Sequence, residues 1–172
     1  MKKEIFLTFL IALLSTEIIS CQSNINRTEI STVSCNSIKI NRYMKKMNIP
    51  ADALVIIVNL KYPCGNCLNH VLNEMHEHHA EYQKAKIYYI LYDINDDKFA
   101  TNMLKNFHLL QSPIVKIDTQ FLSQIIGKSA AYSQYCIIEN TKEKQRLYML
   151  TFDEFMPLFQ ELTAKKLGEI KK

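Results

Sequence analysis

The sequence predicts an α/β fold, because runs typical of buried strands alternate with runs typical of amphipathic helices. Residues 53–60 and 87–94 are nearly continuous apolar runs, which is the pattern of strands buried on both faces. Between them, apolar residues recur at the 3.6-residue helical spacing. Two strand-like runs separated by a polar turn, followed by another amphipathic segment, complete the chain. The expected order is α-β-α-β-α-(β)-α-β-β-α, without internal repeats.

The first half of the domain is expected to contain three helices around the two buried strands. A helix after Asn36 should end before Pro50, and a second should run from near Cys67 to about Lys84. A third should be capped by Asp96 or Asp97. The residues expected on the buried sides of these helices are Ile40, Tyr43, Met44 and Met47; Leu68, Val71, Leu72, Met75, His79 and Tyr82; and Phe99, Met103, Leu104 and Phe107.

The second half is expected to begin with an extended stretch over residues 113–117 and a brief helix over 121–127. Residues 132–138 and 145–150 read as two strands, and the polar turn at 140–144 has the length of a hairpin loop. The last helix should open with the capping box Thr151-x-x-Glu154 and bury Phe155, Leu158, Phe159 and Leu162.

The N-terminus has the pattern of an export signal. Lys2 and Lys3 precede a mostly apolar run over residues 5–14, which is too short to span a bilayer. Residues 18–21 read Ile-Ile-Ser-Cys and resemble the lipobox, where bacterial lipoproteins are lipidated on the cysteine and cleaved just before it. We therefore expect a signal peptide at 1–20, lipidation of Cys21, a spacer at 21–36 rich in Ser, Asn and Thr, and a domain at 37–172.

Composition excludes several function classes. The chain has 172 residues, only three glycines, and neither a P-loop nor a dinucleotide-binding pattern. The formal charge of +4 is modest, and basic and acidic residues are mixed along the chain, so no nucleic acid is expected as a partner. No cofactor is expected either.

The cysteine pair Cys64-Gly65-Asn66-Cys67 lies where a buried strand should end and a helix should begin. At that position, exposed N–H groups and the positive end of the helix dipole stabilise a thiolate on the first cysteine. Cys64 is therefore the expected nucleophile, and Cys67, one turn later, the expected resolving cysteine. In an exported protein such a pair can cycle between dithiol and disulfide.

In this strand–CxxC–helix unit, and in the hairpin and helix at the other end, the sequence resembles the thioredoxin superfamily over residues 50–168. Its longer middle is most similar to the membrane-tethered thiol–disulfide proteins and the peroxiredoxin-like branch, in which a helix and a strand are inserted, here at 112–127. The resemblance implies a thioredoxin-like three-layer sandwich, with a mixed central sheet flanked by helices. It also implies a substrate-binding loop just before the hairpin, at Tyr132 and Ser133.

The sequence departs from this family in the residues around the pair. Pro63 stands where thioredoxins have Trp, and Asn66 stands where Pro is frequent between the cysteines. The proline that the family places opposite the pair is missing beside Ser133, although Pro113 would occupy that position under another alignment.

Histidines and the remaining cysteines leave alternatives open. His70 lies one helical turn beyond Cys67, and His76 and His79 share a helix face, so a zinc or copper site using the cysteines and a histidine is one alternative. In the other reading, His76 and His78 belong to a solvated helix face and His79 caps the apolar stripe. Cys136 is expected to be a buried, inert thiol, with a disulfide to Cys35 as the alternative.

The sequence therefore predicts an exported thiol–disulfide oxidoreductase, lipid-anchored in a bacterial cell envelope and facing the periplasm. Its expected partners are exported cysteine-containing proteins and a membrane redox protein that resets the pair. A binding lipoprotein with a structural cysteine pair is the main alternative.

Overall fold

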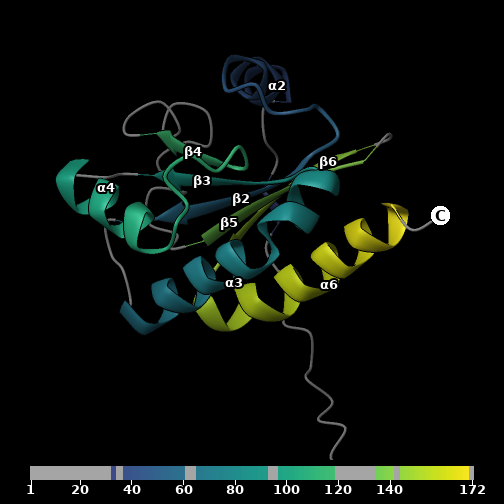
Figure 1. The fold of residues 1–172 in the computed structure, drawn as a ribbon. Helices are drawn as coiled ribbons and strands as arrows, with labels where there is room; N and C mark the ends of the chain where they lie inside the picture. The colour runs from purple at the N-terminus through teal and green to yellow at the C-terminus, as the bar shows by residue number, and fades with distance from the viewer. Residues whose placement is uncertain are drawn as a thin grey trace, which may run out of the picture.

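The computed structural model describes residues 32–33, 37–60, 65–92, 97–118, 135–141 and 144–170 (Figure 1). Its elements, in chain order, are β1 (Thr32–Val33), α2 (Ser37–Lys46), β2 (Leu54–Asn59), α3 (Gly65–Lys84), β3 (Ile87–Tyr92), α4 (Asp97–Asn106), β4 (Val115–Asp118), β5 (Tyr135–Asn140), β6 (Gln145–Leu150) and α6 (Phe152–Ile170). The α/β class predicted from the sequence is confirmed.

The strands form one mixed sheet in the order β1-β6-β5-β2-β3-β4. The strands β2, β3 and β4 are parallel, whereas β5 pairs antiparallel with β2 and β6 pairs antiparallel with β5. The β5–β6 hairpin was expected from the polar turn at 140–144. In the structure Asn140 still belongs to β5, so the turn begins at the next residue. Its first turn residue, Thr141, accepts a hydrogen bond from the Lys144 N–H at 3.0 Å.

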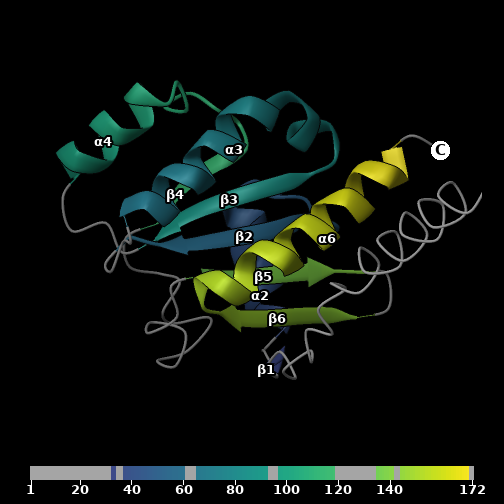
Figure 2. The ribbon, with the colours of Figure 1, turned by 90° about the horizontal axis from the view of Figure 1, so that it is seen from below.

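Helices cover both faces of the sheet, so the domain has three layers (Figures 1 and 2). On one face α3, α4 and α6 pack over one hydrophobic cluster, and on the other face α2 packs over a second. Alternate residues of β2 belong to opposite clusters, Leu54 and Ile56 to the first and Val55 and Ile57 to the second. This is why all six residues of β2 are buried, as the nearly continuous apolar run predicted.

Two residues expected on buried helix faces are exposed. The buried stripe of α4 runs through Ala100, Met103 and Leu104, and at 100° per residue Phe99 lies about 90° from its centre, so it is 54% exposed. His79 has the right spacing for the stripe of α3 but is also exposed. Spacing along one helix does not specify how far the layer beneath that helix extends.

The remaining helix contacts match the expectations. The buried residues of α3 are Leu68, Val71, Leu72, Met75 and Tyr82. In α6, Glu154 accepts hydrogen bonds from the N–H and the hydroxyl of Thr151 at 2.9 and 2.8 Å, which confirms the predicted capping box.

The sheet extends into the segment expected to be a spacer. Thr32 and Val33 pair antiparallel with Tyr148 and Leu147 of β6. Several predicted features lie outside the described residues: the signal peptide, the lipidation site Cys21, the cysteines 35 and 64, the helix at 121–127, and the loop residues Tyr132 and Ser133. Within the described part of the chain, no helix combines the length and hydropathy that crossing a membrane requires.

Candidate functional site

Cys67 lies in the first turn of α3, directly after the central strand β2. The strand ends at Asn59, and the Leu60 N–H donates to the Tyr92 carbonyl at 2.9 Å, which keeps β2 and β3 aligned to their carboxyl ends. The helix begins at Gly65, so the sulfur-bearing Cys67 is its third residue. Cys64 immediately precedes this helix in the sequence, at a residue that the structure does not describe.

The start of α3 is open to solvent. Gly65 and Asn66 are exposed and Cys67 is partly exposed. A Cβ built on Gly65 would meet no atom within 4 Å. The first turn also contains no acidic residue, so no carboxylate of α3 compensates the positive end of its dipole. The arrangement gives an incoming disulfide access to the helix start and gives a thiolate there a favourable potential.

The chain enters β5 at the same end of the sheet. Tyr135, the first residue of β5, pairs with Val58 near the end of β2. Its ring is buried and stacks on Phe155 of α6, with the ring centroids 4.5 Å apart. The predicted substrate-loop residues Tyr132 and Ser133 precede Tyr135 in the sequence, but they lie outside the described residues.

The histidines of α3 spread along the helix rather than gathering at Cys67. His70 is exposed one turn beyond Cys67, whereas His76 is about 9 Å further along the helix axis. The ring of His76 lies 5.7 Å from that of His108, and the Nδ1 of His79 lies 3.3 Å from the carbonyl oxygen of His76. Within the described ranges, no group of three His, Cys, Asp or Glu residues is arranged to hold a metal ion.

Cys136, the second residue of β5, is buried in the cluster beneath α2. It is a free thiol, and burial raises its pKa to about 12. The expected burial is confirmed, and because the thiolate is the reactive form, the raised pKa predicts that this thiol reacts slowly. Cys35, its alternative disulfide partner, lies outside the described residues.

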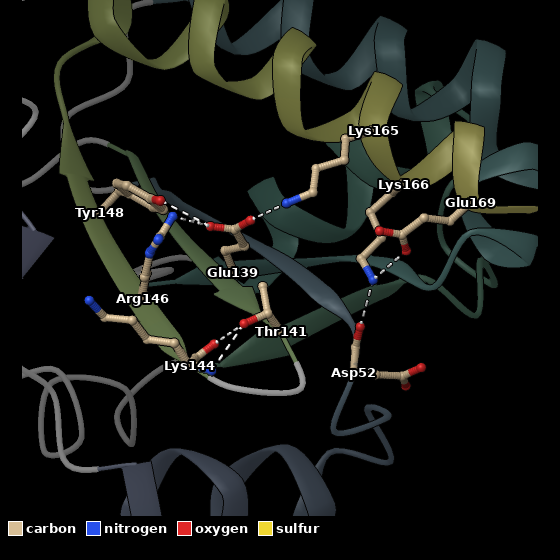
Figure 3. Close-up of polar contacts among 9 residues, drawn as sticks. All are labelled: Asp52, Glu139, Thr141, Lys144, Arg146, Tyr148, Lys165, Lys166 and Glu169. Carbon is tan, nitrogen blue, oxygen red and sulfur yellow. Dashed lines mark hydrogen bonds and ion pairs between the residues drawn. The ribbon is translucent and has the colours of Figure 1, made fainter.

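A polar cluster that the sequence analysis missed lies at the opposite end of the sheet (Figure 3). Glu139 of β5 is buried, and its two carboxylate oxygens accept hydrogen bonds from Lys165 at 2.9 Å and from the Tyr148 hydroxyl at 3.0 Å. Arg146 lies 3.5 Å from the same carboxylate. Burial alone would raise the pKa of Glu139, but the hydrogen bonds and charges of its partners outweigh burial and lower it.

This cluster borders a cavity of about 520 Å³ between the C-terminal half of α6 and the adjoining strand ends. Lys166 reaches into it and donates to the Asp52 carbonyl at 3.1 Å and to Glu169 at 3.2 Å. The charged residues that line the cavity are all paired, Glu139 with Lys165, Lys166 with Glu169 and Asp52 with Lys86, so we interpret the cluster as structural. An acidic residue inside the apolar run of β5, at Glu139, was the sequence signal for it.

A comparison of the chain with protein families, with curated proteins and with solved structures gives no match.

Proposed function

We propose that this protein is a thiol–disulfide oxidoreductase with a thioredoxin-like domain, in which Cys64 attacks and Cys67 resolves. The observation that carries the proposal is the position of Cys67. It is partly exposed in the first turn of a helix that follows the buried central strand, and Cys64 comes directly before that helix.

The arrangement of the sheet supports the thioredoxin-like part of the proposal. A parallel β2–α3–β3 unit and an antiparallel β5–β6 hairpin followed by α6 are joined through the pairing of β2 with β5. This is the combination that the resemblance implies. The strand β4, at Val115–Asp118, lies within the segment where the resemblance expects an inserted strand.

The proposed chemistry needs only the two thiols and a partner disulfide. The Cys64 thiolate attacks one sulfur of the partner disulfide, which breaks that bond and leaves a partner thiolate and a mixed disulfide. Cys67, as its thiolate, then attacks the Cys64 sulfur and releases the second partner thiol. In this direction the partner gains two electrons and the Cys64–Cys67 pair loses them; the reverse steps, starting from the disulfide form of the pair, would oxidise a partner dithiol. A thiol protein at the membrane would return the pair to the dithiol.

The decisive experiment traps the mixed disulfide in cells. Cys67→Ala should accumulate reductant-sensitive complexes with exported proteins, because Cys64 can still attack but nothing resolves the product. The double variant Cys64→Ala/Cys67→Ala should trap none, and Cys67→Ala/Cys136→Ala should trap as much as Cys67→Ala. If Cys67→Ala is expressed like the wild type but traps no more than the double variant lacking both cysteines, exchange is excluded and the cysteine pair is structural.

A further inference from the structure

The helix layers on the two faces of the sheet carry opposite charge. The ten residues of α2 include four cations and no acid, namely Lys39, Arg42, Lys45 and Lys46. On the other face, α3 has three glutamates against one lysine, and α6 has four acids against two lysines. Also on that face, α4 has two lysines against one aspartate. Counted this way, α2 contributes +4, whereas α3, α4 and α6 together contribute −3. The domain is therefore electrically polarised across its sheet.

Packing forces the cations of α2 outward. The inner side of the helix presents Ile40, Tyr43 and Met44, which are all buried against the sheet. The Tyr43 hydroxyl donates to the buried Asp118 of β4, and Gln145 of β6 donates to Asn41 at 3.2 Å, so the helix is held in one rotation. All four cations are consequently exposed on the outer side.

An apolar side chain accompanies these cations. Ile38, in the first turn of α2, is 73% exposed, the highest value among the large apolar residues exposed in the described structure. Anionic lipid headgroups attract a basic helix face, and an exposed apolar side chain beside the cations can enter the lipid interface.

We propose that the outer face of α2 binds the surface of an anionic membrane. The complementary charge explains the attraction, and the acidic α3 and α6 face would be repelled, so the charge polarity selects one orientation. The choice of a membrane over an acidic protein rests on the export and lipidation that the sequence predicts for this oxidoreductase, since α2 begins only sixteen residues after the predicted lipidation site Cys21.

This orientation has a consequence for the cysteine pair. Because α2 lies flat on one face of the sheet (Figure 1), contact through α2 places the strands roughly parallel to the membrane. The strand end that leads to Cys67 then points sideways along the surface, where neighbouring membrane-bound proteins can reach it.

The test measures binding of the full chain carrying Cys21→Ser, which removes the lipid, to vesicles of phosphatidylcholine with and without phosphatidylglycerol. The ratio of the affinity for vesicles with phosphatidylglycerol to the affinity for vesicles without it measures the contribution of charge, separately from any apolar insertion. We expect the fourfold variant Lys39→Gln, Arg42→Gln, Lys45→Gln and Lys46→Gln to lower this ratio at least tenfold, since each cation near an anionic surface contributes about fivefold. The preference should also weaken as added salt shortens the Debye length to about 8 Å.

A matched control removes the same charge elsewhere, with Lys84→Gln, Lys98→Gln, Lys105→Gln and Lys144→Gln, all of which are exposed residues outside α2. It should change the ratio less than threefold, while circular dichroism shows both variants folded. Equal losses in the two variants, or none in the α2 variant, overturn the proposal. Tighter binding to soluble polyglutamate than to the anionic vesicles also overturns it in favour of an acidic protein partner. Because the thiols take no part, failure here leaves the trapping experiment unaffected.

Discussion

At the scale of single residues, the two cysteines that the structure describes have very different environments. Cys67 lies at an open helix start, whereas Cys136 is enclosed by apolar residues of the sheet and α2. Burial raises the pKa of Cys136 to about 12, so its thiolate is scarce at neutral pH. One thiol is partly open to solvent and the other is enclosed in the core.

We expect Cys136 to resist alkylation in the folded protein. Iodoacetamide at mildly alkaline pH should label it only after denaturation, as peptide mass spectrometry would show, with Cys136→Ala identifying the signal. Labelling of Cys136 at equal rates in the native and denatured protein would contradict the buried placement.

Glu139 provides a second test at the residue scale. Replacing Glu139 with Gln removes the charged acceptor of Lys165 and Tyr148, and should lower the free energy of unfolding by about 1–3 kcal/mol at pH 7. Glu77→Gln, on the exposed side of α3, should change it by less than about 0.5 kcal/mol. Urea unfolding monitored by circular dichroism measures both.

The loss of stability in Glu139→Gln should also depend on pH, in a definite direction. The pKa of Glu139 is lower in the folded state, so its stabilisation is present above the unfolded pKa of about 4.3 and is lost as pH falls through the folded pKa. The difference between wild type and Glu139→Gln should therefore shrink in acid. A difference that stays constant from pH 7 down to strongly acidic pH would show that Glu139 stabilises the fold by packing alone.

At the scale of elements, periodic apolar residues predicted which segments are helices and strands, because each helix or strand must bury one face or both. The capping box at Thr151 was equally local and was confirmed by its hydrogen bonds. The prediction that Phe99 is buried was wrong because this residue lies at the edge of the buried stripe of α4, where spacing alone does not decide between core and solvent.

Phe99 and Phe155 were both expected on buried helix faces, but replacing each with alanine should affect stability differently. Phe155 is fully buried between Tyr135 and Phe159, so Phe155→Ala should lower the free energy of unfolding by about 3–5 kcal/mol. Phe99→Ala should change it by less than about 0.5 kcal/mol, because its ring is mostly in water. Similar losses in denaturant titrations of the two variants would restore Phe99 to the core.

At the scale of the whole molecule, the predicted lipid anchor at Cys21 and the basic face of α2 would have separate roles. The lipid would hold the chain at a membrane, and α2 would decide which face of the domain meets it. This division of roles requires that the anchor, rather than α2 alone, keeps the protein in the membrane fraction after a high-salt wash.

We therefore expect Cys21→Ser to shift the protein from the salt-washed membrane fraction to the soluble fraction of bacterial cells, and to abolish incorporation of labelled fatty acid. Cys35→Ser should keep both properties of the wild type. Fatty-acid labelling that persists in Cys21→Ser would refute lipidation at this residue.

The sequence by itself determined the α/β class, most element positions, and the cysteine pair at a strand–helix junction. These features depend on contacts within a few residues, which periodicity and turn chemistry record. Only the tertiary structure decided that Glu139 and Lys165, 26 residues apart, form an ion pair, and that the cations of α2 lie opposite the acids of α3 and α6. Strand order and direction bring such distant segments together, and no local pattern encodes which partners meet once the sheet has formed.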